Sequence, residues 1–227
     1  MLGGDIIREV SLDLNDQEPG YEYTRWTRDQ LQTYLREALF EVSSRFKSWF
    51  LQTVTVRVEP GAGWQKACDC SEIVRLLGEA DSSGRILNFL SKQDDHVDLV
   101  WSGAPDPCAT NARYYRMRRY SISSTDDAYF RVYPPVPAGL TRYVLVECFK
   151  RPDGDLHDSV PDTAVAMVKQ WMLYRALSVD SENNTTITQL ATTHKDTFFK
   201  LAEAALELQL LEERRNGNLR EVQKQTD

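Results

Sequence analysis

The sequence lacks the short motifs that mark common catalytic and nucleotide-binding sites. It contains no GxGxxG, GxxxxGK[ST], GxSxG or HExxH pattern. It has no internal repeat of solenoid length, and no apolar run approaches the roughly 20 residues of a membrane span. We therefore expect no membrane helix, no cofactor or metal site and no catalytic residue, and we predict that the protein is not an enzyme.

Positive charge is also in deficit. Lys and Arg number 27 against 34 Asp and Glu in 227 residues, which gives a formal net charge of -7. This balance argues against a globally basic nucleic-acid-binding protein. With 41% hydrophobic residues, the chain can bury a substantial core in one large domain or two small ones.

Cysteine and histidine are scarce. The four cysteines, Cys68, Cys70, Cys108 and Cys148, form no CxxC pair, and only three histidines are available to supplement them as ligands. We expect free thiols in a reducing compartment, with the first two packed as small apolar groups. The N-terminal residues lack the basic start and continuous apolar core of a signal peptide, which favours synthesis and folding in a cytoplasm.

The remaining candidate acid–base groups do not form a catalytic constellation. His96 and His157 lie in acidic loops, and His194 falls on an apolar helical stripe. We interpret these as loop, turn and core or interface residues. Asp180 and Glu182 follow a predicted helix end, where a solvated cap is favoured over a hydrolytic carboxylate pair.

Helical periodicity marks both ends of the chain. Apolar residues recur three and four apart over residues 5–14, and again after a capping box at residues 27–30. A third helix, residues 163–178, is apolar almost all round, so other elements must cover most of its sides. Its start is predicted at Ser159-Val160-Pro161-Asp162, with the serine as N-cap and the proline in the first turn.

A last helix follows the same period from Ile187 to about Glu213. The sequence Arg214-Arg215-Asn216-Gly217-Asn218 is expected to end it. The polar remainder, residues 216–227, is predicted to be a flexible C-terminal tail.

The middle of the chain has the alternation typical of strands. Residues 52–59 alternate polar and apolar side chains. The strongest further signal is a predicted hairpin of Tyr129–Tyr133 and Leu140–Phe149, whose connecting loop holds three prolines and a glycine. Shorter strands are predicted at residues 64–70, 73–77, 85–89, 97–101 and 114–122.

This order of elements predicts an α+β fold. The N- and C-terminal helices, residues 1–50 and 155–215, are expected to form a helical bundle. Residues 51–154 are expected to form an inserted antiparallel β domain, either a sandwich or a small barrel.

Residues 113–120 interleave basic and aromatic side chains, as single-stranded nucleic-acid platforms do. On a strand, mixed faces favour a sheet edge or a subunit contact, and a nucleic-acid-binding module is the less favoured interpretation. One face would carry Tyr114, Arg116, Arg118 and Tyr120, and the other Tyr115, Met117 and Arg119.

Several segments together resemble a known family. FRVYPPVPAG at residues 130–139 and YRALSVDSEN at residues 174–183 are the most specific of them. With these and with Pro161-Asp162 and Arg25-Trp26-Thr27, the chain resembles the head-to-tail adaptor proteins of short-tailed phages, including the tail tubular protein A group. The resemblance spans roughly residues 5–210.

The resemblance implies a structural role in the virion and brings no catalytic residues. Such adaptors form a ring, commonly of twelve subunits, beneath the portal and above the tail nozzle. The implied partners are the portal protein, the nozzle protein, further copies of the chain and the genome DNA that passes through. An acidic ring would repel DNA phosphates and let the genome slide without specific binding.

Two surfaces are candidate interfaces. The end of the last helix is expected to dock on the portal, through Leu208, Leu211, Arg214, Arg215 and Leu219. The stiff loop is expected to contact a neighbour or the nozzle, through Pro134, Pro135, Val136, Pro137 and Gly139. The competing function is a tail-associated cell-wall hydrolase.

Overall fold

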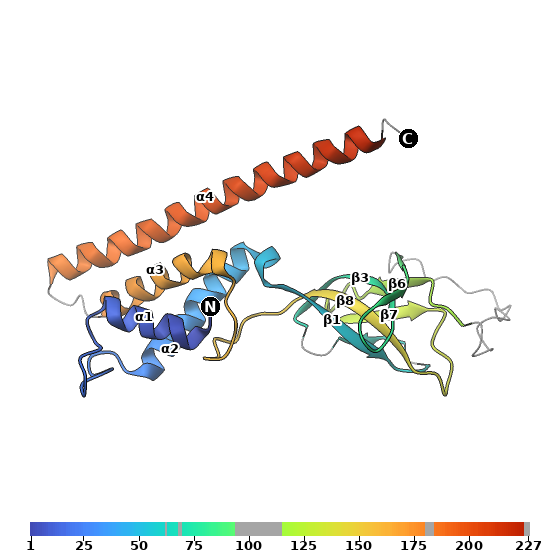
Figure 1. The fold of residues 1–227 in the computed structure, drawn as a ribbon, viewed down its shortest axis with the longest axis horizontal. Helices are drawn as coiled ribbons and strands as arrows, with labels where there is room; N and C mark the ends of the chain where they lie inside the picture. The colour runs from blue at the N-terminus through green and yellow to red at the C-terminus, as the bar shows by residue number, and fades with distance from the viewer. Residues whose placement is uncertain (62, 68–69, 94–114, 180–183, 225–227) are drawn as a thin grey trace. The chain divides into compact units, whose positions relative to one another are not determined.

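The computed structural model describes residues 1–61, 63–67, 70–93, 115–179 and 184–224. The chain forms two compact units (Figure 1). The helical unit comprises Met1–Arg45 and Pro152–Asp227, and the β unit comprises Phe46–Arg151. The expected α+β class is confirmed, because the strands follow two helices and precede two helices along the sequence.

The helical unit is organised around its third helix. Its elements are α1 (Gly3–Asp13), α2 (Arg28–Arg45), α3 (Asp162–Val179) and α4 (Thr185–Lys224). Helix α3 packs against the other three, and Figure 1 shows α4 running alongside it. The prediction that neighbours must cover α3 is confirmed, because Ala164, Val168, Met172 and Ala176 are fully or almost fully buried.

The capping box predicted for the second helix is present. The Thr27 backbone N–H donates to Gln30 Oε1 at 2.9 Å, and the Gln30 backbone N–H donates to Thr27 Oγ1 at 3.3 Å. The serine cap predicted for α3 is wrong. Ser159 instead forms a β-bridge with Leu2, and the helix begins at Asp162. Ser159 is therefore engaged in a backbone contact with Leu2, from the start of the chain, and does not cap α3.

Asp16 organises the loop that leads into α2. Its buried carboxylate accepts hydrogen bonds from the Thr24 hydroxyl and from the backbone N–H groups of Thr24, Arg25 and Trp26, at 3.0 to 3.3 Å. Burial alone would raise the pKa of this carboxyl. The donated hydrogen bonds outweigh burial and hold the pKa of Asp16 below its ordinary value of 3.8.

Replacing Asp16 by Ala is expected to lower the free energy of unfolding by about 4 kcal/mol at neutral pH, because four donors lose their acceptor at about 1 kcal/mol each. A lowered folded-state pKa contributes stability above pH 3.8, and this contribution is lost as pH falls through the folded-state pKa. Urea unfolding at neutral and acidic pH checks both statements. A gap between wild type and Asp16→Ala that stays constant across this range would contradict them.

Helix α4 is longer than the sequence predicts. The expected end at Arg214–Asn218 is wrong, because α4 continues as one helix to Lys224. Gly217 costs a helix only about 1 kcal/mol relative to alanine, and good helix formers follow it. Most of the expected tail, residues 216–227, is therefore helical, and residues 225–227 lie outside the described part.

The described residues of the β unit form two four-stranded sheets. One has the order β1 (Leu51–Val58), β8 (Arg142–Phe149), β3 (Glu72–Ala80), β4 (Ile86–Asn88). The other has the order β2 (Gln65–Lys66), β7 (Tyr129–Tyr133), β6 (Arg119–Ile122), β5 (Ser91–Lys92). A short 3₁₀ helix, η1 (Lys47–Phe50), precedes β1. All pairs are antiparallel except β5 with β6, which is parallel.

The predicted hairpin is wrong, although both of its strands exist. β7 pairs with β6 and β2, whereas β8 pairs with β1 and β3, so the proline loop carries the chain from one sheet to the other. The buried side chains of both sheets form one core, which includes Val56, Leu76, Phe130 and Val144. The observed strands at residues 65–66 and 119–122 are shorter than predicted, and the strand predicted at 97–101 lies outside the described residues.

Two cysteines depart from the free-thiol expectation. Cys70 and Cys148 form a disulfide with a Cα–Cα distance of 5.8 Å. Pairing of β3 with β8 brings them together across 78 residues of sequence, a separation that carries no spacing signal. Cys68 and Cys108 lie outside the described residues.

Candidate interaction surfaces

The first part of α4 is fixed to α3. The Phe198 side chain is completely buried, and its ring centroid lies 4.8 Å from that of Trp171. His194 Nδ1 lies 2.7 Å from Gln170 Oε1, within hydrogen-bond distance. Burial lowers the pKa of His194 below its ordinary 6.5, against an opposing influence of Asp13. The expectation that His194 is a packed residue is confirmed.

The next part of α4 exposes a group of leucines. Leu206, Leu208, Leu210 and Leu211 are 50%, 63%, 47% and 59% exposed. We call these four residues the leucine surface. An α-helix turns roughly 100° per residue. Relative to the stripe of α4 that faces α3, two of the four leucines therefore lie on one side and two lie on the other. The apolar arc of α4 is thus wider than one neighbouring helix covers.

Exposed apolar residues grouped on one helix are a candidate interaction surface. Residues 201–213 also carry four glutamates and no Lys or Arg, so the leucines have an acidic surrounding. Of the residues predicted to dock on the portal, Leu208, Leu211, Arg214 and Arg215 are exposed. Leu219 also lies in α4, and its side chain is outside the described part. Leu206 and Leu210 of the leucine surface were not among the predicted residues.

The proline loop is partly built into the β unit. Val136 belongs to the core between the sheets, and Pro134 is buried. The Tyr115 hydroxyl donates to Pro134 O at 2.7 Å, and the Gly61 backbone N–H donates to Val136 O at 2.8 Å. Gly139 has a φ of +84°, which favours glycine at this turn. Only Pro135, Pro137 and Gly139 of the five predicted contact residues reach the surface.

The described part of the basic and aromatic cluster, residues 115–120, buries its tyrosine rings. Tyr115, Met117 and Tyr120 are buried in the β-unit core, whereas Arg116, Arg118 and Arg119 are exposed. The predicted faces hold for Tyr115 and Met117 and fail for Arg119 and Tyr120, because the regular strand begins only at Arg119. Buried tyrosines cannot stack with bases, so the described residues 115–120 do not offer the aromatic platform that a single-stranded nucleic-acid site needs. Arg113 and Tyr114 lie outside the described residues.

No catalytic or metal-binding group emerges from the described residues. They contain no cluster of three or more His, Cys, Asp or Glu residues that could hold a metal ion. His157 lies in a turn where its backbone N–H donates to Asp155 Oδ1 at 3.1 Å. His96, Asp180 and Glu182 lie outside the described residues. None of the helices described is both long and apolar enough to cross a membrane.

Glu79 is the one buried carboxylate with a raised pKa that the structure describes. Burial raises its pKa, although its Oε2 accepts the Met117 backbone N–H at 3.2 Å and the carboxylate also interacts with arginine. Arg142 Nε lies 3.3 Å from Glu79 Oε1, in an ion pair without hydrogen-bond geometry. These contacts join β3 and β8 to the segment before β6, so Glu79 is a structural group.

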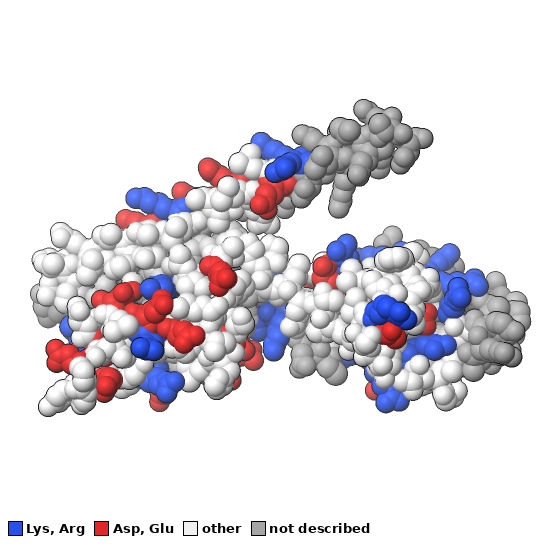
Figure 2. Space-filling view, in the orientation of Figure 1, with Lys and Arg blue, Asp and Glu red and all other residues white. Residues whose placement is uncertain are grey.

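Charge is divided between the two units. The helical unit carries 13 Lys and Arg against 22 Asp and Glu, a net charge of -9. The β unit carries 14 against 12, a net charge of +2. Figure 2 shows acidic residues gathered on the helical unit and basic residues spread over the β unit. The acidic excess of the chain therefore lies in the helical unit.

The architecture thus consists of a helical unit with an exposed leucine surface and a β unit with a basic exterior. A family model described as SU10 adaptor protein matches residues 1–222. No curated protein matches the chain.

Proposed function

We propose that this chain, which belongs to the SU10 adaptor protein family, forms a ring between the portal and the tail nozzle through which the phage genome passes. Membership of the family supports a structural virion protein that contacts portal and tail components. The observation that carries the proposal is the leucine surface, because apolar side chains exposed together on one helix require a protein partner. The proposed ring has twelve copies.

Recruitment to capsids tests the adaptor role. The full-length protein should co-sediment with portal-bearing capsids and should not co-sediment with capsids that lack the portal. Equal recovery with both kinds of capsid would contradict the role.

The end of α4 is the proposed portal contact. Deleting residues 214–227 removes two exposed arginines and the last turns of a helix, without touching the residues buried against α3. We expect recruitment to portal-bearing capsids to fall at least tenfold while the unfolding midpoint stays unchanged, because only the interface is shortened. Quantitative sedimentation and thermal unfolding give the two readouts. Unchanged recruitment would exclude this segment from the portal contact.

The channel wall of the ring is proposed to be acidic. Since the acidic excess lies in the helical unit, an acidic wall requires that this unit supplies the channel surface. DNA phosphates would then be repelled and the genome would slide without adhering. We expect Asp and Glu to outnumber Lys and Arg among lumen-facing residues of an assembled ring determined by electron microscopy. A wall dominated by Lys and Arg would overturn this prediction.

The surface part of the proline loop is proposed to contact a neighbouring copy or the nozzle. The buried Val136 side chain anchors the loop in the core of the β unit, so Pro135 and Gly139 lie exposed on a turn that is held in place. A preordered loop loses little entropy when it binds.

A cell-wall hydrolase is not favoured. In the described residues, the one carboxylate with a raised pKa is engaged by backbone and arginine, and no second carboxylate is paired with it. Turbidity clearing of cell-wall preparations would detect such an activity, and we expect none.

A further inference from the structure

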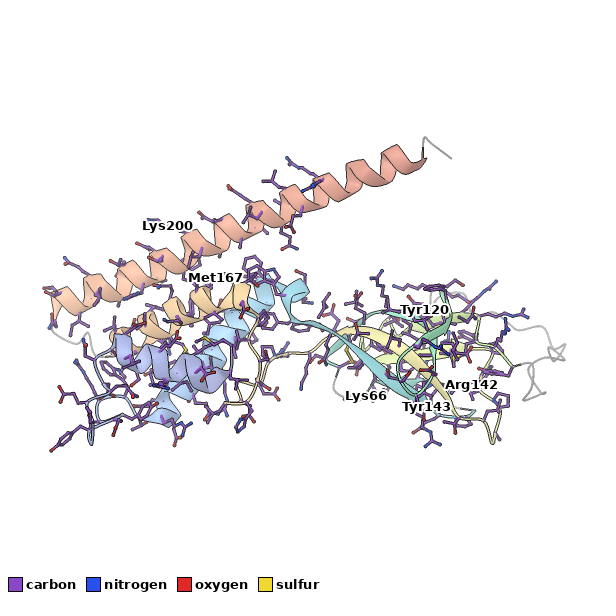
Figure 3. The ribbon with its side chains drawn as sticks, viewed as in Figure 1. Lys66, Tyr120, Arg142, Tyr143, Met167 and Lys200 are labelled. Carbon is purple, nitrogen blue, oxygen red and sulfur yellow. A yellow bond between two sulfur atoms is a disulfide. The ribbon has the colours of Figure 1, made fainter. Side chains whose placement is uncertain are left out.

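A groove lies where an edge strand of each described sheet borders the same side of the β unit. Strand β1 is the edge of one sheet and β2 is the edge of the other, and in the described residues no strand pairs with the outer edge of β1. Figure 3 labels Lys66 on β2. The groove has a volume of about 930 Å³. Its lining comprises Val54, Thr55, Val56, Arg57, Glu59, Pro60, Trp64, Gln65, Lys66 and Tyr129.

The groove contains a buried donor without an acceptor. Gln65 is only 7% exposed, and its Oε1 accepts the Glu59 backbone N–H at 2.9 Å. Its Nε2 has no hydrogen-bond partner among the described residues. A buried amide left unpaired costs about 1 to 3 kcal/mol. Because Gln65 Nε2 is closed to solvent in the single chain, a ligand gains from it only if its acceptor displaces the groups that cover this nitrogen.

The rim of the groove is positively charged. Arg57 and Lys66 are exposed, and neither has an acidic partner in the part of the chain that the structure describes. Glu59 is the sole acid among the lining residues. Trp64 is partly exposed, and the Arg131 guanidinium lies 4.5 Å from the centroid of its ring. A ligand that complements this rim carries negative charge and apolar side chains.

We propose that this groove binds an extended, acid-bearing segment of a second protein, which adds a strand to β1. Strand addition uses main-chain hydrogen bonds for affinity and alternate side chains for specificity. β1 has eight residues, which at about 3.3 Å per residue offer an edge of about 26 Å. The groove lining carries Arg57 and Lys66 against one acid, Glu59, which favours an acid-bearing segment of a different protein as the occupant. The inference does not depend on a ring.

A synthetic strand tests the proposal. The probe is a fluorescein-labelled decapeptide that alternates valine with threonine or glutamate, titrated against the full-length protein by fluorescence anisotropy. We expect saturable binding that weakens at least tenfold when alternate peptide nitrogens are methylated, because methylation removes the N–H groups that pair with an edge. The double variant Arg57→Glu, Lys66→Glu should weaken binding at least tenfold as well.

Lys92→Glu is the matched control, since Lys92 is an exposed cation on β5, the opposite edge of the second sheet. We expect it to bind the peptide as the wild type does. Absence of saturable binding, or equal binding of the methylated peptide, would overturn the proposal. Unchanged binding by the Arg57→Glu, Lys66→Glu variant would also overturn it. The two cations would then serve only to prevent edge-to-edge pairing of β1 with other chains. An equal loss in Lys92→Glu would indicate general charge attraction and would likewise overturn it.

Discussion

Replacing Leu208 and Leu211 together by glutamate is expected to weaken assembly about 1000-fold while the chain stays folded. Burying a leucine at an interface contributes about 2 kcal/mol, and each tenfold change in affinity corresponds to about 1.4 kcal/mol. Because both side chains are more than half exposed in the single chain, the substitutions should change the free energy of unfolding by about 0.5 kcal/mol or less. Sedimentation velocity with and without portal measures assembly, and urea unfolding measures stability.

Leu12→Glu provides the control for this double variant. Leu12 is a leucine of similar exposure, 52%, on α1, outside the leucine surface. We expect it to assemble as the wild type does. Wild-type assembly by Leu208→Glu, Leu211→Glu would remove the leucine surface from the interface. Equal defects in all variants would mean that surface leucines contribute without regard to position.

Replacing Phe198 by Ala is expected to lower the free energy of unfolding of the helical unit by about 3 to 5 kcal/mol. This is the usual cost of removing a fully buried aromatic side chain and leaving a cavity. Phe198 packs on Trp171 of α3 and lies below the Arg45 guanidinium of α2, so its loss weakens the contact that holds α4. Chemical unfolding monitored by the fluorescence of the five tryptophans, Trp171 among them, measures the change.

The adjacent Phe199 is a matched control, because it has the same chemistry on a more exposed side of the same helix. Its ring makes one edge contact with Phe198 at 5.3 Å, so Phe199→Ala should cost only about 1 kcal/mol. Equal losses for the two alanine variants would show that α4 is not anchored through its buried stripe. A small loss for both would show that α4 contributes little to the stability of the helical unit.

Features set by local chemistry were predictable from the sequence. The capping box at Thr27 and Gln30 forms because its two hydrogen bonds join residues three apart. β1 and β7 follow the alternation that defined them. The need of α3 for cover on most sides is visible in its own composition.

Features set by distant partners were not predictable. Strand β8 has partners in β1 and β3, far earlier in the chain, so the adjacent β7 was wrongly paired with it. The disulfide between Cys70 and Cys148 depends on the same long-range pairing. The Ser159 cap failed for a related reason, since Leu2 from the other end of the chain pairs with it.

The candidate interface was also predictable only where local sequence determines it. Leu208 and Leu211 were identified from the helix end, whereas Leu206 and Leu210 emerge only when the extent of α3 along α4 is known. The length of α4 was underestimated because Gly217 was weighed as a helix stop, although one glycine costs a long helix little.

Electron microscopy of the full-length protein mixed with portal tests the ring most directly. The account predicts a closed ring of twelve copies coaxial with the portal, with the end of α4 at the portal contact and an open central channel. The protein alone and the Leu208→Glu, Leu211→Glu variant are imaged alongside. A portal with no ring, or copies attached singly around its outer surface, would contradict the account.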